Sequence, residues 1–351
     1  MNPKNKTLRQ LLLTLGLLAV SLACATAQEL LTGTPTPVPT PSQTPTQAPT
    51  ATASFTPTAT VVPTLDWTPI PCDGEECIEA CMERVETIME ESPFQGAETD
   101  FLDDSTNYDL ASYPVDGDQL GDMESLWVPQ SYKPLQEDQI NHARIWAYFT
   151  TVIPPEIRQR VDHLIVFTDG NRNKLAWVKR TEDEGELWTI GFDMADADYP
   201  PYLTETLVHE VGHLVTLDAS QVALGDNNPL TCETYLLYDG CSYEESYINL
   251  FYQKFWTDLQ KEWSQVEQAT SEEEFRIMVA NFYRRHPWEF VSGYAATSPV
   301  EDIAESWTAF ILEPKPDGAS IAEEKVLFFY DFPELTAYRE QIIGRLCSYV
   351  Q

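Results

Sequence analysis

The chain has 351 residues, which is enough for one large domain or two modest ones. Hydrophobic residues make up 43% of it and aromatic residues 11%, so most of the chain can form a globular core. Its formal net charge of -35 argues against nucleic acid as a partner and against binding to anionic membranes through basic patches. Such a charge suits a soluble protein that works outside the cell.

The N-terminus predicts export. Three basic residues precede the apolar run LLLTLGLLAVSLA, which is too short for a comfortable transmembrane helix and ends in small residues, as a secretory signal does. Two processing sites compete. ATA fits an ordinary cleavage site and gives a signal over residues 1–27, whereas Cys24 in SLAC could carry a lipid and attach the protein to a bacterial membrane. Either outcome predicts an extracellular protein, secreted or anchored at the cell surface.

A segment rich in proline and threonine follows at residues 28–65. A segment of this composition cannot build a core, so we expect an extended, polyproline-like spacer. Its threonines are candidate sites for O-linked sugars. The segment is therefore predicted to be a disordered stalk that holds the next domain away from the membrane or wall.

The cysteines indicate disulfide bonds, because an even number remains after Cys24 in an exported chain. These are Cys72, Cys77, Cys81, Cys232, Cys241 and Cys347. Cys232 and Cys241 bracket a short loop and are the pair that we expect first. The pairing of the other four stays open, and a bond from Cys347 back to the 72–81 cluster would join the two ends of the domain. A zinc cluster in CDGEECIEAC is the alternative, which the oxidising compartment and the lack of a nearby histidine disfavour.

The remaining sequence predicts an α+β fold. Residues 66–134 are acidic and loop-rich after one helical segment, and we expect a disulfide-linked N-terminal extension or a propeptide. The domain itself is predicted over 135–351 and begins with a helix at 136–153. Three strand-like runs follow, HLIVFTD, LAWVKR and LWTIGFDM, with turn sequences between them, so we predict a small antiparallel meander. The part of the chain after residue 243 is predicted to be mostly helical.

The stretch LTETLVHEVGHLVTLD carries the clearest chemical motif. His209 and His213 stand four residues apart, so on a helix they lie one turn apart and can reach one metal ion. Glu210 lies about 100° around the helix, where it can hold a metal-bound water without binding the metal. Gly212 would let another segment approach closely. A core helix with two satisfied histidines is the alternative, but the spacing with the glutamate in place favours zinc.

A catalytic zinc site needs a third protein ligand. No histidine follows the motif closely, which excludes a third histidine there, and the three other histidines are expected to be structural: His142, His163 and His286. The carboxylate candidates are Glu244, Glu245, Glu301 and Glu305. Glu301 and Glu305 share one face of an otherwise apolar helix, where a carboxylate needs a partner such as a metal or its histidine ligand. Alternatively, Glu301 completes a capping box that starts at Ser298.

The two motifs together resemble a known family. HEVGH, followed much later by YAATSPVEDIAESW, is similar to the gluzincin zinc metallopeptidases of the anthrax lethal factor and Pro-Pro endopeptidase type. The resemblance covers roughly residues 135–312 and is specific only at these motifs. It implies a zincin-like fold with a small antiparallel sheet packed on the HEVGH helix. It also implies that Glu301 is the third zinc ligand, that Tyr294 assists catalysis, and that Glu305 supports a ligand histidine.

These residues predict a secreted or surface-anchored zinc-dependent endopeptidase. His209, His213 and Glu301 would bind Zn2+, Glu210 would act as the general base, and Tyr294 would stabilise the carbonyl oxygen. The partner would be an extended peptide or protein substrate that adds as a strand along the edge of LWTIGFDM. We expect a monomer.

Three alternatives stay open at this point. Tyr294 could be a packed tyrosine without a role in catalysis. The protein could be a non-catalytic surface binding protein that zinc stabilises, although such a site has no use for Glu210 and is usually closed by four protein ligands. It could also be a hydrolase of peptidoglycan cross-links, with the same chemistry and a different substrate.

Overall fold

The structure is a computed structural model and describes residues 80–81, 83, 107–170, 174–181, 185–194 and 203–349. The chain divides into two units, Met1–Asp66 and Trp67–Gln351, and every described residue belongs to the second. The predicted signal, Cys24, the stalk, Cys72 and Cys77 lie outside the described residues, and what the sequence predicts for them stays a prediction. None of the helices in the described ranges is both long enough and apolar enough to cross a bilayer.

The described residues form a six-stranded mixed sheet, so the fold is α+β. Its strands are β1 (Tyr108–Asp116), β2 (Gln119–Leu120), β3 (Glu124–Ser125), β4 (Val161–Thr168), β5 (Ala176–Arg180) and β6 (Trp188–Asp193). They follow the order β2-β1-β4-β6-β5, and β3 pairs with β1 off this path. All pairs are antiparallel except β4 and β6, which are parallel.

The three predicted strand runs are strands, but the predicted antiparallel meander is wrong. Strand β5 does not lie between β4 and β6; it pairs antiparallel with the far edge of β6 and ends the sheet. Strand β6 is buried at all its positions, as suits an interior strand, whereas β5 has an exposed Lys179, as suits an edge strand. Since β6 is paired on both sides, the expectation that a peptide adds along it is also wrong. Strand β5 forms one edge of the described sheet, and the short strands β2 and β3 lie at the other end.

Strand β1 lies in the acidic stretch for which the sequence predicted loops. It pairs antiparallel with β4 and contributes Leu110, Ala111 and Tyr113 to the core. Strand β1 does not have a typical strand sequence, because it contains Pro114 and has aspartates near its ends. Both residue types are depleted in strands. The sheet therefore begins before residue 135, the predicted start of the domain.

Helices cover the sheet and make up most of the C-terminal half. The helices from the first half of the sheet through the HEVGH motif are α3 (Lys133–Glu137), α4 (Gln139–Val152), α5 (Pro155–Arg158) and α6 (Thr204–Thr216). They are followed by α7 (Tyr247–Phe255), α8 (Gln260–Val266), α9 (Glu272–Arg285), α10 (Pro299–Leu312), α11 (Ile321–Phe328) and α12 (Pro333–Tyr349). Short 3-10 turns are η1 (Gln130–Tyr132), η3 (Ala295–Thr297) and η4 (Phe329–Asp331), and β7 (Val222–Leu224) pairs with β8 (Gly240–Ser242).

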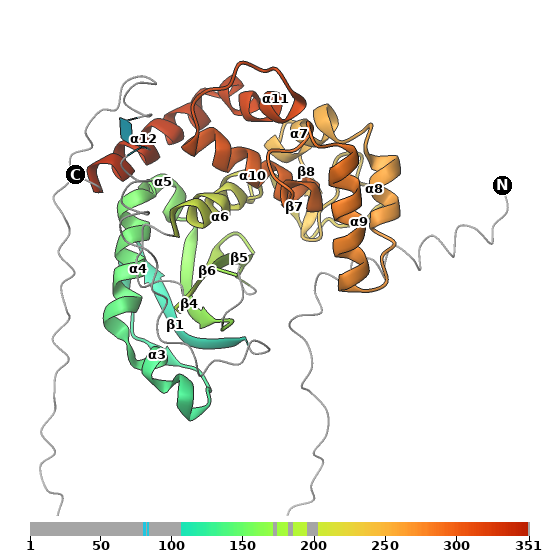
Figure 1. Ribbon diagram of the computed structural model, residues 1–351. Coiled ribbons are helices and arrows are strands. Elements are labelled where there is room, and N and C mark those ends of the chain that lie inside the picture. The colour runs from blue at the N-terminus through green and yellow to red at the C-terminus, as the bar shows by residue number, and fades with distance from the viewer. Residues whose placement is uncertain are drawn as a thin grey trace, which may run out of the picture. The chain divides into compact units, whose positions relative to one another are not determined.

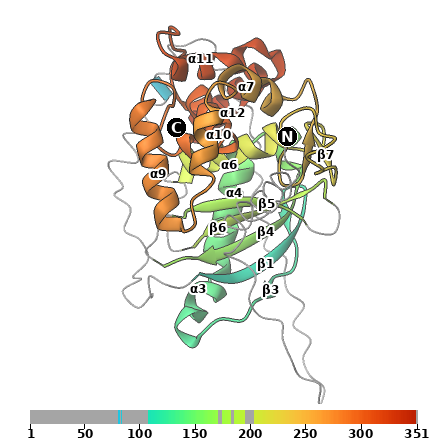
Figure 2. The ribbon, with the colours of Figure 1, turned by 90° about the vertical axis from the view of Figure 1, so that its right-hand side faces the viewer.

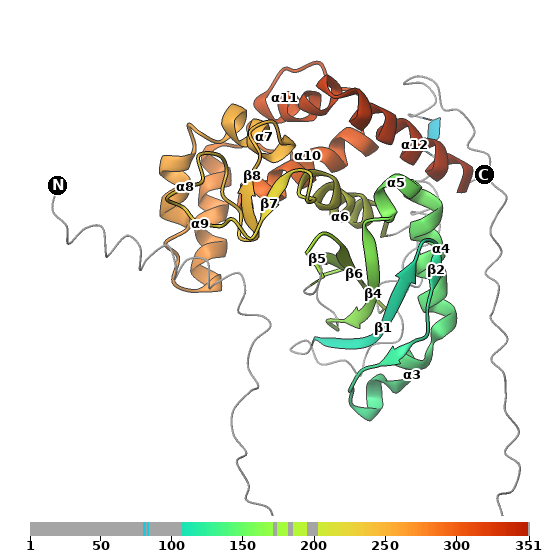
Figure 3. The same cartoon turned by 180° about the vertical axis from the view of Figure 1, so that it is seen from behind.

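The arrangement places α6 between the sheet and the later helices. Figures 1 and 2 show the sheet on one side of α6 and the helices α7 to α12 gathered on the other. Helix α4 packs against the sheet, and its Phe149 ring lies 6.2 Å from the ring of Phe192 on β6. Seen from behind, β1 and β2 run beside α4 (Figure 3). The motif helix is therefore buried from both sides, with the sheet below and α10 above.

Two disulfide bonds join described cysteines, as the sequence predicted. Cys232 bonds to Cys241 and closes the loop between β7 and β8. Cys81 bonds to Cys347 on α12, with a sequence separation of 266 residues. The sequence left the partner of Cys347 open, and the structure identifies it as Cys81 of the N-terminal cysteine cluster. This bond ties the segment before the sheet to the last helix.

Candidate metal centre

Helix α6 carries both motif histidines into the interior of the protein. Its residues from Leu207 to Thr216 are all buried, and His209, Glu210 and His213 are 7%, 8% and 8% exposed. Buried polar side chains need partners, because an unpaired one costs about 1–3 kcal/mol. The partners of these histidines come from α10.

Gly212 explains how α10 comes so close. A Cβ atom at this position would lie 2.9 Å from Cδ1 of Trp307 and 3.2 Å from the Cα of Ala304, both on α10. A larger residue would push the two helices apart. The predicted use of Gly212 is confirmed, and the close approach offsets the cost of about 1 kcal/mol that a glycine adds within a helix.

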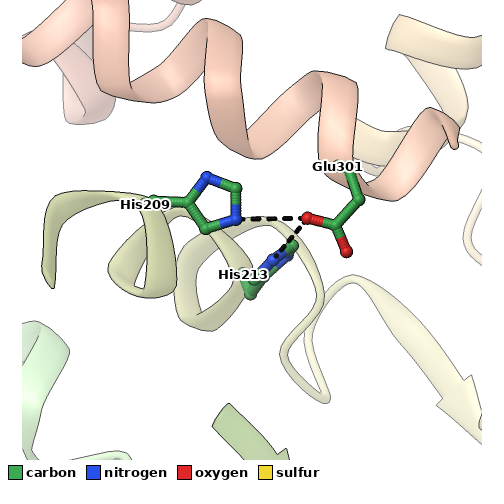
Figure 4. A group of neighbouring side chains, drawn as sticks. All are labelled: His209, His213 and Glu301. Atoms are coloured by element: carbon green, nitrogen blue, oxygen red, sulfur yellow. Dashed lines mark hydrogen bonds and ion pairs between the residues drawn. The ribbon is translucent and has the colours of Figure 1, made fainter. Parts of the chain in front are cut away.

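Three side chains converge at the junction of α6 and α10. Nε2 of His209 lies 3.1 Å from Oε2 of Glu301, and Nε2 of His213 lies 3.4 Å from the same oxygen. Figure 4 shows both imidazole rings and the carboxylate pointing toward one another. One nitrogen or oxygen from each of the three residues lies within 4.8 Å of the others. The residues that the sequence predicted as metal ligands are thus brought together.

The spacing of these donor atoms suits a tetrahedral zinc ion. Zinc binds nitrogen and oxygen ligands at about 2.0–2.2 Å, which puts neighbouring ligand atoms about 3.3 Å apart. The distances of 3.1 Å and 3.4 Å to Glu301 match this value. Two histidines and one carboxylate also leave a coordination position for water. The residues present therefore fit the metal that the motif predicts.

Electrostatics at the junction favour a cation. Burial alone would lower the pKa of His209, but hydrogen bonds to Glu301 and Glu305 and nearby carboxylate charges raise it to about 10. Burial raises the pKa of Glu301, yet His213 and His209 outweigh this and hold it well below the usual range. A proton on His209 supplies the positive charge that these carboxylates need, and a divalent cation would supply more.

Glu305 orients His209, as the resemblance implies. Its Oε1 lies 2.7 Å from Nδ1 of His209. A carboxylate on this nitrogen fixes the ring and leaves Nε2 facing Glu301. Glu305 in turn accepts a hydrogen bond from the Ser292 hydroxyl at 2.5 Å.

Sequence reasoning missed Ser292. Its hydroxyl oxygen also accepts a hydrogen bond from the backbone N–H of Ala295 at 3.0 Å, so it joins Glu305 to the turn that follows Tyr294. The signal available in the sequence was its place two residues before Tyr294 in VSGYAAT. A serine there is unremarkable until the two helices are packed together.

Tyr294 lies at the edge of the site. Its ring centre is 5.7 Å from that of His209. The pKa of its hydroxyl is raised, by shielding from water, by the charges of Glu301 and Glu210, and by a hydrogen bond with Glu301. The residue is 54% exposed, so it lies between the site and the solvent. The hydroxyl therefore keeps its proton at neutral pH and can donate it in a hydrogen bond.

Glu210 sits beside the ligand group without being one of its three members. Burial raises its pKa, and the charges of His213 and His209 act in the opposite direction. A carboxylate with a raised pKa is a stronger base than an ordinary one. Its location and its pKa both suit the base role predicted from the motif.

The sequence predicted either a capping box or a metal ligand at the N-terminus of α10, and the structure contains parts of both. Ser298 caps the helix, since its hydroxyl oxygen accepts a hydrogen bond from the N–H of Glu301 at 3.1 Å. The Glu301 carboxylate, however, faces the histidines. The cap therefore belongs to Ser298, and the side chain of Glu301 is available to a metal.

A buried ion pair fixes α10 on a second side, about 100° around the helix from Glu301. Nζ of Lys325 on α11 lies 2.6 Å from Oδ2 of Asp302, and both side chains are fully buried. The indole N–H of Trp256 donates to the same oxygen at 2.7 Å. Burial raises the pKa of Asp302 to about 6, although Lys325 and Trp256 act against this. These contacts join α7, α10 and α11 at the residue that follows the candidate ligand Glu301.

The remaining candidates are not part of the site. Glu244 and Glu245 are exposed in the loop before α7. His142 is buried, with Nδ1 2.7 Å from the hydroxyl of Tyr113 and Nε2 3.0 Å from a backbone carbonyl oxygen. The other two histidines lie beside carboxylates of their own: Asp162 for His163, and Glu262 and Glu289 for His286. Among the described residues these histidines have structural contacts, as expected.

Comparison of the chain with protein-family models, with curated proteins and with solved structures finds no match. The description of the site therefore depends on its residues and their geometry.

Proposed function

We propose that the protein is a zinc-dependent endopeptidase of the gluzincin type, exported and either secreted or anchored at the cell surface. The observation that carries the proposal is the convergence of His209, His213 and Glu301 beside the buried Glu210. A purely structural metal site has no need of a buried base with a raised pKa. The open coordination position favours catalysis over a non-catalytic zinc-stabilised binding protein.

Each side chain has a separate role in the proposed reaction. Zinc, when bound, supplies Lewis acidity, which polarises a carbonyl and lowers the pKa of water to about 7. Glu210 takes the proton of the attacking water and passes it to the leaving amine. Glu305 and Ser292 keep His209 in the orientation that leaves Nε2 toward Glu301.

Strand β5 is the surface along which we propose that the substrate lies. It is the edge strand of the sheet and contacts α6. The guanidinium of Arg180 on β5 donates to the backbone carbonyl of Leu217, directly after α6, and so holds the strand beside the motif helix. An extended peptide paired with this edge would run past the catalytic residues.

Replacing Tyr294 by phenylalanine tests the role proposed for its hydroxyl. We expect kcat to fall by about a hundredfold, as for other donors to a developing oxyanion, with KM and zinc content nearly unchanged. Steady-state kinetics together with metal analysis measures all three quantities. Full activity in Tyr294→Phe would make this tyrosine a packing residue.

The proposed function as a whole is tested by metal analysis and a cleavage profile on the native protein. We expect one zinc ion per chain and hydrolysis of internal bonds in a random peptide library, with activity lost on chelation and restored by zinc. Zinc binding without any cleavage would favour the non-catalytic alternative. The absence of zinc binding would contradict the proposal.

A further inference from the structure

A hollow opens in the surface next to Tyr294, between α9 and the segment that leads into α10. Its volume is about 520 Å³. Helix α9 lines it with Arg276, Tyr283 and Arg284, among others, and the opposite wall includes Gly293 and Thr297. No role in the proposed reaction uses these residues.

The hollow adjoins the candidate metal centre through one short segment. Gly293 and Thr297 flank Tyr294 in the chain, and the Thr297 hydroxyl donates to the Tyr294 carbonyl oxygen at 2.7 Å. The ring of Tyr294 lies beside His209. The segment 293–297 thus lines the hollow with Gly293 and Thr297 and places Tyr294 beside the candidate metal centre.

The hollow is lined by positive charge, whereas the chain as a whole is strongly negative. The sequence has 56 acidic and 21 basic residues, yet two arginines line this one hollow. Arg284 donates to Asn281 and to the carbonyl oxygen of Ala280, and within the described ranges it has no carboxylate partner. Arg276 is 3.1 Å from Glu273, but both side chains are mostly exposed, so this pair is weak and exchangeable. The hollow is thus a local positive site in an acidic protein.

The shape of the hollow favours a ligand that has methylene groups as well as a negative charge. A Cβ atom at Gly293 would lie 3.9 Å from the ring of Tyr283, so the glycine leaves room beside this ring. An aromatic face accepts methylene groups, and guanidinium groups pair with carboxylates in forked geometry. Glutamate and aspartate side chains combine these two features.

We propose that this hollow is a substrate subsite for an acidic side chain, which pairs with Arg276 and Arg284 and packs on Tyr283. The proposal depends on the proposed function, because it assumes that a peptide lies across the metal centre. It predicts that the protein selects substrates with glutamate or aspartate at one fixed position near the cleaved bond.

Cleavage of a matched peptide pair tests the subsite. A random octapeptide library identifies the preferred position, and two peptides are then made that differ only by Glu or Gln there. We expect the double variant Arg276→Gln, Arg284→Gln to lower kcat/KM for the Glu peptide by about tenfold, with less than a twofold change for the Gln peptide. Arg285→Gln is the control, because Arg285 is also exposed on α9 but pairs with Glu262 instead of lining the hollow. It should change neither value by more than about twofold.

A binding measurement separates failure of the subsite from failure of the proposed function. The inactive variant Glu210→Gln, immobilised, is incubated with the same library, and retained peptides are identified by mass spectrometry. Enrichment of acidic residues that disappears when both arginines are also replaced supports the subsite, whether or not the native protein cleaves peptides. No acidic preference, equal losses for the Glu and Gln peptides, or the same effect from Arg285→Gln would overturn it.

Discussion

Replacing Glu210 by glutamine is expected to slow peptide cleavage by at least about a hundredfold and to leave zinc content unchanged. Glutamine has nearly the same shape but cannot accept the proton of the attacking water. General-base catalysis contributes about a hundredfold to ten thousandfold, so kcat should fall within that range. The three candidate ligand atoms belong to other residues, which is why the metal should stay. Turnover of a cleaved library peptide and metal analysis of the same sample measure both effects.

A matched control lies on the same helix. Glu205 is exposed in the first turn of α6 and is not one of the candidate ligands, so Glu205→Gln should retain both zinc and activity. If Glu210→Gln kept full activity, the proposed mechanism would be wrong. If it lost zinc, Glu210 would be a ligand rather than a base.

Replacing Glu301 by alanine is expected to remove zinc. The carboxylate oxygen of this residue is the atom that faces both histidines, and no other carboxylate belongs to the ligand group found among the described residues. Loss of an outer partner of a metal ligand costs about tenfold to a hundredfold in affinity, so loss of a direct ligand should cost more than about a hundredfold. Titration of the metal-free protein with zinc, followed by calorimetry, gives the affinity.

Ser298 provides the control for this variant, because it separates the cap from the ligand. Ser298→Ala removes the hydrogen bond to the N–H of Glu301 and should cost about 1 kcal/mol of stability, with zinc affinity retained. A Glu301→Ala protein that still bound zinc with native affinity would show that Glu301 contributes only to the helix terminus.

The part of the site on α6 could be predicted from the sequence, whereas the part on α10 could be predicted only in part. His209 and His213 stand four residues apart, and helix geometry alone places such a pair on one face, so their proximity can be predicted from the sequence. Glu301 stands 92 residues after His209, and no local rule joins the two. The resemblance supplied that link, and the packing of α10 on Gly212 supplies its physical basis. Ser292 could not be found, because its contact with Glu305 exists only after this packing.

Three strands of the sheet could be predicted, but strand β1 and the order of the strands could not. Alternation and apolar runs identify β4, β5 and β6, because these patterns reflect burial along each strand. Which strand pairs with which depends on contacts across the sheet. The continuous burial of β6 is the feature that fits an interior strand. Because β6 is paired on both sides, the edge proposed for peptide binding is that of β5.

The junction of α6 and α10 also has a thermodynamic consequence. Its three donor atoms come from helices far apart in the sequence, so they meet only when α10 has docked, and the unfolded chain has no such site. An ion that binds only the docked state stabilises it by mass action, by about 2.7 kcal/mol at a free concentration one hundred times the dissociation constant. Zinc availability in the surroundings would then set the stability of the folded protein as well as its proposed activity.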